Sequence, residues 1–331
     1  MERRPLGGTG LTVSPIGLGM AALGRPAYIN LGHELDLGDD LGVQAVERHA
    51  HGVLDAAWAA GVRYLDVARS YGRGEEFLAS WLHTREIPAG AAVVGSKWGY
   101  RYVGDWRVAA EVHEVKDHSA AAFDEQWPKS RALLGTHLAL YQIHSATLGT
   151  GVLRDRAVLE RLARLRTEQG ILVGVTTSGP NQAATIREAL EAEVDGFRPF
   201  ACVQATWNPL EPSAAPALAE AHDAGWGVIV KEALANGRLT ARERDRDVLG
   251  NRAPLDRAAA DLDTGVDAVA IAAAIAQPWA DVVLSGAATL GQLRSNLAAL
   301  AIEPAAMEFD PAPTPMDPGD YWRLRSELRW A

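Results

Sequence analysis

The 331-residue sequence has only one cysteine, Cys202, so a disulfide cannot form within the chain. Disulfides belong to oxidising compartments, and their exclusion is typical of a protein kept in a reducing one. In the segment Phe200-Ala201-Cys202-Val203 the thiol has apolar neighbours on both sides. A cysteine in such a setting behaves as a small buried apolar side chain, so we do not expect a catalytic thiol.

The sequence also lacks a long apolar run. Its most membrane-like stretch, residues 268–276, covers about half of the ~20 residues that a bilayer requires. The first residues, Met1-Glu2-Arg3-Arg4-Pro5, lead into glycine-rich turns rather than into the apolar core of a signal peptide. We therefore expect a cytoplasmic protein without a membrane partner.

Positive charge is scarce, because 32 lysines and arginines face 42 aspartates and glutamates, a net charge of -10. Binding to nucleic acids or to anionic membranes requires clustered cations, so both classes of partner are unexpected. Small anionic ligands are not excluded, since a local site can hold them. With 48% hydrophobic and 22% charged residues, the chain can bury a large core.

Apolar strand-like segments alternate with amphipathic helical ones along most of the chain. Counting the strand at 15–19, the expected strands are 15–19, 62–66, 92–97, 138–144, 171–176, 201–205, 227–230 and 282–285. The expected helices are 46–60, 75–84, 120–134, 157–169, 182–192, 214–224 and 266–276. Eight strands separated by helices predict a parallel sheet closed into an α/β (β/α)8 TIM barrel.

An open doubly wound sheet is the alternative. It requires a glycine-rich phosphate turn after the first strand, but Gly17-Leu18-Gly19-Met20-Ala21-Ala22 lacks the third glycine of that fingerprint. The barrel is therefore favoured, as one domain over residues 1–331. Glycines at 7, 8 and 10 predict a β-hairpin before the first strand. The loop 235–265 and the tail 304–331 are expected as additions at the barrel mouth, the tail with a Pro-rich extended start and a helix over 321–330.

Charged and polar side chains close three of the apolar strands. Asp66 ends the second strand with Tyr71 five residues later, Lys97 ends the third, and His144 ends the fourth. In a barrel the carboxyl ends of all strands share one face, so these residues can converge. Alone, Asp66 and Tyr71 would more often be a helix-capping carboxylate and a half-buried ring.

The types of these side chains suggest proton transfer to a carbonyl oxygen. A tyrosine with its usual pKa of about 10 is a poor acid at neutral pH unless its phenolate is stabilised. Lys97 close to Tyr71 would favour the phenolate, Asp66 would keep Lys97 charged, and His144 could donate a hydrogen bond to the same carbonyl oxygen.

These residues resemble the Asp-Tyr-Lys-His tetrad of the aldo-keto reductase superfamily. The resemblance extends to the opening Leu6-Gly7-Gly8-Thr9-Gly10-Leu11, to Leu140-Tyr141-Gln142-Ile143-His144, and to the late Gln292-Leu293-Arg294-Ser295-Asn296-Leu297. It implies a (β/α)8 barrel and NADPH-dependent reduction of an aldehyde or ketone, with Tyr71 as general acid. Lys97 and Asp66 would tune that acid, and His144 would orient the carbonyl.

The same resemblance implies a set of cofactor contacts. Thr176 and Thr177 match the positions that meet the nicotinamide carboxamide, as does Gln204. The full implied set is Gly19, Met20, Thr176, Thr177, Gln204, Lys231, Glu232, Ala233, Leu234, Gly286, Ala287, Ala288, Gln292, Ser295 and Asn296.

Two departures from the family pattern concern the cofactor. Lys231 stands where the family usually has an aromatic residue that stacks on nicotinamide. The lysine expected after the eighth strand for the 2'-phosphate of NADPH is absent, with Arg294 the nearest cation. A missing charge-assisted contact is worth about 1.5 to 3 kcal/mol, so NADPH is the first expectation but NADH is not excluded.

Tryptophans after strand ends are the candidates for substrate contact: Trp98, Trp106 and Trp207. His113 and His118 flank acidic residues, but their spacing is not that of a metal motif, so no metal is expected. Two other functions remain open: a cofactor-dependent isomerase, dehydratase or sugar dehydrogenase on the same fold, and a non-catalytic cofactor sensor. The sequence leaves the substrate, the reaction direction and the oligomeric state undetermined.

Overall fold

The computed structural model describes residues 1–243, 245–303 and 312–330. In it eight parallel strands close into a barrel, each paired with its neighbours in the order β3, β4, β5, β8, β9, β10, β11, β12 and back to β3. Their bounds are β3 (Ile16–Gly19), β4 (Tyr64–Asp66), β5 (Val93–Trp98), β8 (Leu138–Ala146), β9 (Leu172–Thr177), β10 (Phe200–Thr206), β11 (Gly227–Lys231) and β12 (Val282–Ser285). The predicted (β/α)8 barrel is confirmed.

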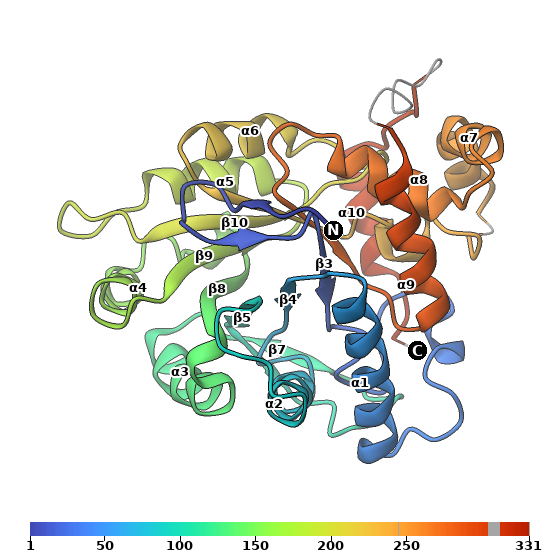
Figure 1. The fold of residues 1–331 in the computed structure, drawn as a ribbon. Helices are drawn as coiled ribbons and strands as arrows, with labels where there is room; N and C mark the ends of the chain where they lie inside the picture. The colour runs from blue at the N-terminus through green and yellow to red at the C-terminus, as the bar shows by residue number, and fades with distance from the viewer. Residues whose placement is uncertain (244, 304–311, 331) are drawn as a thin grey trace.

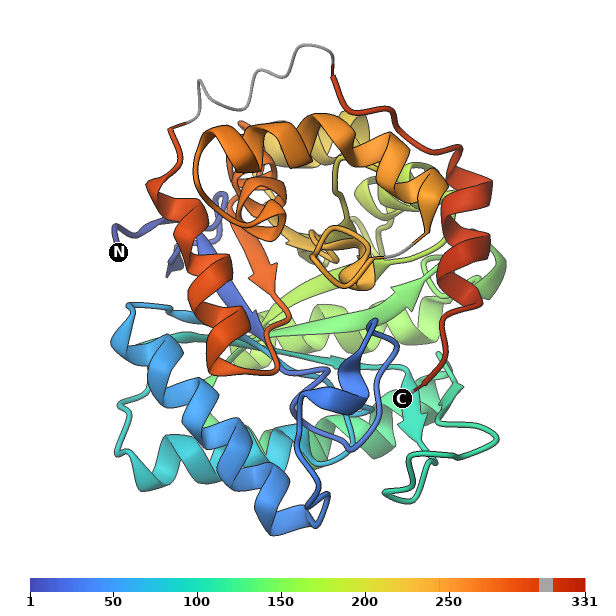
Figure 2. The same cartoon turned by 90° about the vertical axis from the view of Figure 1, so that its right-hand side faces the viewer.

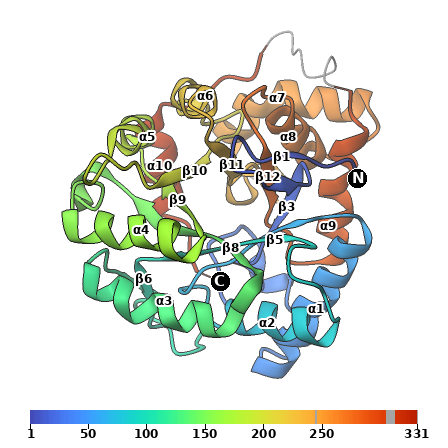
Figure 3. The ribbon, with the colours of Figure 1, turned by 60° about the vertical axis from the view of Figure 1, so that its left-hand side comes forward.

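A ring of helices surrounds the strands, as Figures 1 and 3 show from two sides. These are α1 (Val43–Ala59), α2 (Gly74–Thr84), α3 (Ala120–Leu134), α4 (Arg156–Gln169), α5 (Gln182–Glu191), α6 (Ala215–Asp223), α8 (Val266–Ile275) and α9 (Leu290–Leu297). Helix α1 buries Val46, Ala50, Val53, Leu54 and Ala57, the helical spacing of a single apolar face. Among the described residues no helix combines the length and apolar character needed to cross a membrane.

The N-terminal hairpin covers the end of the barrel where the strands begin. Strands β1 (Arg4–Pro5) and β2 (Thr12–Val13) pair antiparallel, as predicted. Leu6 and Val13 are fully buried there in one apolar cluster with Cys202. Gly7 has φ +50, and a Cβ on it would lie 2.5 Å from the carbonyl carbon of Trp226, so only glycine fits this approach. Burial raises the pKa of the Cys202 thiol to about 12, consistent with a packing role.

The loop expected over 235–265 and the segment 98–119 both contain regular structure. Residues 98–119 form a hairpin from β6 (Tyr100–Tyr102) and β7 (Glu114–Lys116), and 235–265 contains α7 (Arg246–Asp261). The sequence of α7 is rich in Arg and Asp and includes Pro254, features that obscured its helical pattern. Leu255 and Ala259 nevertheless join an apolar cluster with Val269 and Tyr321, so tertiary packing selects the helix.

The C-terminal helix α10 spans Pro318–Ser326, shorter than the predicted 321–330. The expected Pro-rich start at 304–311 lies outside the described residues. Figure 2 shows α10 beside the barrel mouth and the chain end beside the segment of residues 20–40. Trp330 stacks on His113 with ring centroids 4.2 Å apart and packs edge-on against Tyr28, so the C-terminal segment lies over the mouth. Short 3-10 helices complete the fold: η1 (His33–Leu35), η2 (Gly135–His137), η3 (Leu148–Thr150), η4 (Ala235–Gly237) and η5 (Ala298–Ala301).

Candidate active site

A cavity of about 610 Å³ lies at the carboxyl ends of the barrel strands. Its walls come from segments far apart in the sequence, including Gly19, Tyr71, His144, Gln204 and Gln292. Cavities of a few hundred Å³ at this face of a barrel are the usual sites for cofactors and substrates. The cavity is therefore the candidate active site.

The predicted tetrad comes together beside this cavity. The Lys97 ammonium forms an ion pair with Asp66, donates to the carbonyl of Val67 at 3.0 Å, and lies 3.3 Å from Tyr71 Oη. The Lys97 and Asp66 side chains are only 1% and 2% exposed, so each charge depends on the other for compensation. Gln204 Nε2 donates to the second oxygen of Asp66 at 2.8 Å and holds the carboxylate from across the barrel.

Backbone contacts fix the turn that carries Tyr71. The amide of Arg69 donates to the carbonyl of Lys97 at 3.0 Å, and the amide of Arg73 donates to the carbonyl of Gly24 at 2.8 Å. A Cβ on Gly24 would lie 2.3 Å from the carbonyl oxygen of Tyr71. This close approach of two backbones requires glycine and places the phenol in the cavity wall.

The charge state of Tyr71 differs from the simplest expectation. Burial and then the nearby Asp66 charge raise the pKa of Tyr71 well above 10, so the phenol is protonated at neutral pH. From the sequence, Lys97 is expected to have the opposite effect and to lower the pKa of Tyr71. In the structure the Lys97 charge is largely compensated by Asp66, and the net direction is upward. Tyr71 thus presents a neutral phenol in the cavity wall.

His144 is neutral. Burial and then the charge of Lys97 lower its pKa well below 6.5. Its Nδ1 lies 3.4 Å from Ser70 Oγ, so the serine hydroxyl can donate to Nδ1. The proton of the neutral ring then resides on Nε2, which is free to donate to a ligand. The ring packs edge-on against Tyr71 with centroids 5.5 Å apart, so both donors serve one region of the cavity.

An aromatic and charged wall lies next to the tetrad. Arg25 is 1% exposed, donates to Glu114 at 2.8 Å, and sits over the rings of Tyr28 at 5.0 Å and Trp330 at 4.6 Å. Tyr100 also lines the cavity, 4.9 Å from the His144 ring. The residues of this wall come from three separate segments, 25–28, 100–114 and 330, which share no sequence motif.

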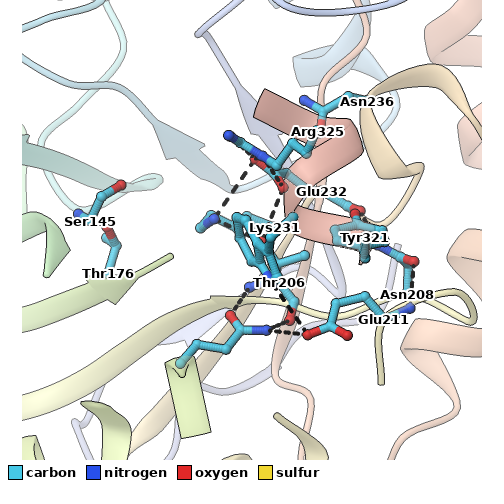
Figure 4. A network of polar contacts seen from close by, with 12 residues as sticks. Ser145, Thr176, Thr206, Asn208, Glu211, Lys231, Glu232, Asn236, Tyr321 and Arg325 are labelled. Atoms are coloured by element: carbon cyan, nitrogen blue, oxygen red, sulfur yellow. Dashed lines mark hydrogen bonds and ion pairs between the residues drawn. The ribbon is translucent and has the colours of Figure 1, made fainter. Parts of the chain in front are cut away.

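Lys231 ends β11, Glu232 follows it, and both belong to a buried network with the C-terminal helix (Figure 4). Glu232 accepts a bifurcated hydrogen bond from the Arg325 Nε–H, 3.0 Å to each carboxylate oxygen, and one of 3.1 Å from Thr206 Oγ1. Lys231 donates to Thr206 Oγ1 at 2.8 Å. Burial lowers the pKa of Lys231 to about 8, whereas Arg325 and Lys231 lower that of Glu232 to about 2 despite its burial.

Most of the predicted cofactor residues line the cavity: Gly19, Gln204, Lys231, Glu232, Ala233, Leu234, Gly286, Ala287, Gln292, Ser295 and Asn296. Four others are buried outside its lining: Met20, Thr176, Thr177 and Ala288. The hydroxyl of Thr176 accepts the amide of Ser145 at 2.6 Å and so supports the wall from behind. Ser145 and Ser178, which sequence reasoning did not name, line the cavity in that region.

The three predicted substrate tryptophans do not line this cavity. Trp98 is fully buried with its ring edge-on to Phe123, and Trp207 is buried edge-on to Trp279. Trp106 is half-buried and donates its indole N–H to the carbonyl of Leu41 at 2.7 Å. A position after a strand does not by itself decide whether a side chain turns into the mouth. Trp330, at the end of the chain, is the tryptophan in the described cavity wall.

The comparisons with known proteins agree with this geometry. Over 325 residues the chain is 25% identical to uncharacterized oxidoreductase YqkF of Bacillus subtilis (strain 168), covering 90% of this chain and 91% of that protein. A stretch of 100 residues is 38% identical to pyridoxal 4-dehydrogenase of Microbacterium luteolum, covering 30% of this chain and 24% of that protein.

Solved structures give the same picture. The crystal structure of PA4992 of Pseudomonas aeruginosa, assigned as an aldo-keto reductase, is 25% identical with a TM-score of 0.63, covering 91% of this chain and 96% of that one. The holo form of aldo-keto reductase AKR11C1 from Bacillus halodurans shares the fold at 22% identity and a TM-score of 0.68, over 98% and 96% of the two chains. The model of the aldo/keto reductase family matches residues 15–310, so the chain belongs to this family of oxidoreductases.

Proposed function

We propose that the protein is an NAD(P)H-dependent carbonyl reductase that converts an aldehyde or ketone into an alcohol. The observation that carries this proposal is the convergence of Tyr71, Lys97, Asp66 and His144 beside one cavity, with the Tyr71 hydroxyl 3.3 Å from the Lys97 ammonium. Two uncharged donors and one buried cation there suit a reaction that places negative charge on a carbonyl oxygen.

Tyr71 gives its proton to the carbonyl oxygen, and His144 Nε2 donates a hydrogen bond to the same atom. The raised pKa of Tyr71 keeps that proton in place until the oxygen becomes basic. Once the proton has moved, the Lys97 ammonium stabilises the phenolate. Asp66 keeps Lys97 charged and oriented, because it is the anionic partner of the ammonium in a buried environment.

The cavity fits a nicotinamide dinucleotide, which supplies the hydride when it is bound. Gly286 has open space where a side chain would stand, with no heavy atom within 4 Å of a Cβ built there. Helix α9 begins just beyond, and the backbone N–H groups of its first turn can donate hydrogen bonds to oxygen atoms of the dinucleotide. Ser145, Ser178 and Gln204 offer polar atoms beside the tetrad, where the carboxamide would lie. The cavity lining thus combines apolar side chains with many polar and charged ones.

The test compares Tyr71→Phe with Tyr102→Phe, in which the altered ring is outside the cavity lining. A positioned general acid contributes about 10² to 10⁴ in rate, so Tyr71→Phe is expected to lose that factor in the oxidation of NADPH or NADH with an aldehyde panel. Affinity for the dinucleotide, measured by fluorescence titration, should stay within about twofold, because the ring remains. Retention of most of the activity in Tyr71→Phe would disprove this mechanism.

The reverse reaction, oxidation of an alcohol, is a second candidate. It is favoured by the likeness over 100 residues to a protein named pyridoxal 4-dehydrogenase. The same site would serve, because the minor phenolate form of Tyr71, stabilised by Lys97, would accept the proton of the alcohol. The same variants, assayed with an alcohol panel and oxidised dinucleotide, decide which direction is faster.

A further inference from the structure

The end of the cavity away from Tyr71 carries more negative than positive charge. Its ionisable side chains in the described residues are Asp36, Arg242 and Asp267. The remaining cations of the cavity wall, Arg25, Lys231 and Arg325, belong to the tetrad end described above. Two carboxylates and one guanidinium leave this end with one uncompensated negative charge.

The guanidinium of Arg242 is already engaged. Its two terminal nitrogens donate to the two oxygens of Asp36 at 2.5 and 3.0 Å, a forked pair that satisfies both groups. Burial would raise the pKa of Asp36, but hydrogen bonds from His33, Arg242 and Gln292 lower it to about 2, so the carboxylate is ionised. The positive charge of Arg242 is therefore already paired with the Asp36 carboxylate.

The side-chain amide of Gln292 also has hydrogen-bond partners within the protein. Its Nε2 donates to Asp36 at 2.9 Å, and its Oε1 accepts the amide of Ala288 at 2.8 Å. The side chain nearest the start of α9 thus bridges the helix to a carboxylate and adds no cation. A phosphate at this position would meet the Asp36 charge directly behind the amide.

Asp267 is the second carboxylate at this end. It lies in the first turn of α8. The amide of Asn296 is best satisfied when its oxygen accepts from Ser285 Oγ at 2.8 Å and its nitrogen donates to Asp267 Oδ2 at 3.1 Å. Within the described part of the chain, Asp267 has a neutral hydrogen-bond donor and no ion-pair partner.

We propose that this end of the cavity selects the adenosine half of a dinucleotide without a 2'-phosphate, so that the protein prefers NADH over NADPH. The inference rests on the proposed function, which places the nicotinamide half beside Tyr71 and the adenosine half at Asp267 and Gln292. A carboxylate suits ribose hydroxyls, which can donate to it, and repels a phosphate, whose ordinary partner is an arginine. The sequence motifs favour NADPH as the cofactor, whereas the charges of the folded site favour NADH.

Isothermal titration with ADP-ribose and with 2'-phospho-ADP-ribose tests the adenosine end alone, without turnover. In low salt we expect ADP-ribose to bind at least about tenfold more tightly than 2'-phospho-ADP-ribose. This ratio of the two dissociation constants should fall as ionic strength screens the repulsion. Asp267→Asn should narrow the ratio by about threefold or more by tightening the phosphorylated ligand, because the amide keeps the contact with Asn296 but not the charge.

Asp223→Asn is the matched control. It removes the same charge from a side chain that is 85% exposed and outside the cavity lining, and it should leave the ratio unchanged. Tighter binding of 2'-phospho-ADP-ribose than of ADP-ribose to the unmodified protein would overturn the inference and leave the reductase proposal standing. Failure of NADH, NADPH and both ribose ligands to bind would overturn the two together.

Discussion

Removal of the Arg325 side chain provides a sharp test of the network beneath the cavity. Arg325 is the principal partner of Glu232, whose side chain is 9% exposed, and Arg325 itself is 23% exposed. Breaking a buried ion pair by deleting one partner costs about 3 to 5 kcal/mol, since the other charge stays buried. Glu232 would keep the hydroxyl of Thr206 at 3.1 Å and the Lys231 ammonium at 3.8 Å. We therefore expect Arg325→Met to cost about 2 to 3 kcal/mol, below that range.

Urea denaturation followed by tryptophan fluorescence measures this loss as a lower midpoint at unchanged slope. Arg323→Met is the matched control on the same helix, because Arg323 is 56% exposed and its ion pairs with Asp320 and Glu327 are on the surface. It should leave the midpoint unchanged. Adding Glu232→Gln to Arg325→Met should recover part of the loss, because the unpaired charge is gone. Equal midpoints for the two single variants would refute the reasoning.

Two further predictions concern the cavity wall. Because burial lowers the pKa of Lys231 to about 8, raising the pH from 7 to 9 removes its positive charge, and the affinity for the anionic dinucleotide should fall through that window. Titrations across this range should show no such inflection in Lys231→Met, and a flat profile for the unmodified protein would contradict the prediction. Gly24→Ala should lower kcat/KM by about 10² by displacing Tyr71, since the new Cβ would lie 2.3 Å from the Tyr71 carbonyl oxygen. Gly52→Ala in α1, with open space at its Cβ, should instead stabilise the protein by about 0.5 to 1 kcal/mol with unchanged activity.

The barrel and the tetrad could be predicted because both depend on local sequence patterns. Each strand is a short apolar run. The closed sheet fixes the position of the residue that ends each strand. The barrel topology alone is enough to bring together Asp66, Lys97 and His144. Tyr71 needed in addition a turn of fixed length after Asp66, which the sequence also shows.

Positions that depend on side-chain direction could not be predicted in the same way. Thr176 and Thr177 end a strand as expected, yet both are buried behind the cavity wall. Trp98 ends β5 and turns into the core against Phe123. A strand alternates its side chains between two faces, and a shift of one residue at a strand end decides between cavity and core.

The residues after β11 show why charge at a site cannot be judged from a motif alone. In the sequence, Lys231 indicates only that the aromatic ring usual in the family is missing. Burying a lysine and the glutamate that follows it costs free energy unless hydrogen-bond or ion-pair partners are supplied. The structure supplies them from Thr206 on the neighbouring strand and from Arg325, 93 residues further along the chain. The C-terminal helix that brings Arg325 is also the one that leads to Trp330 over the mouth. The charge balance of Glu232 therefore depends on that helix being docked against the barrel.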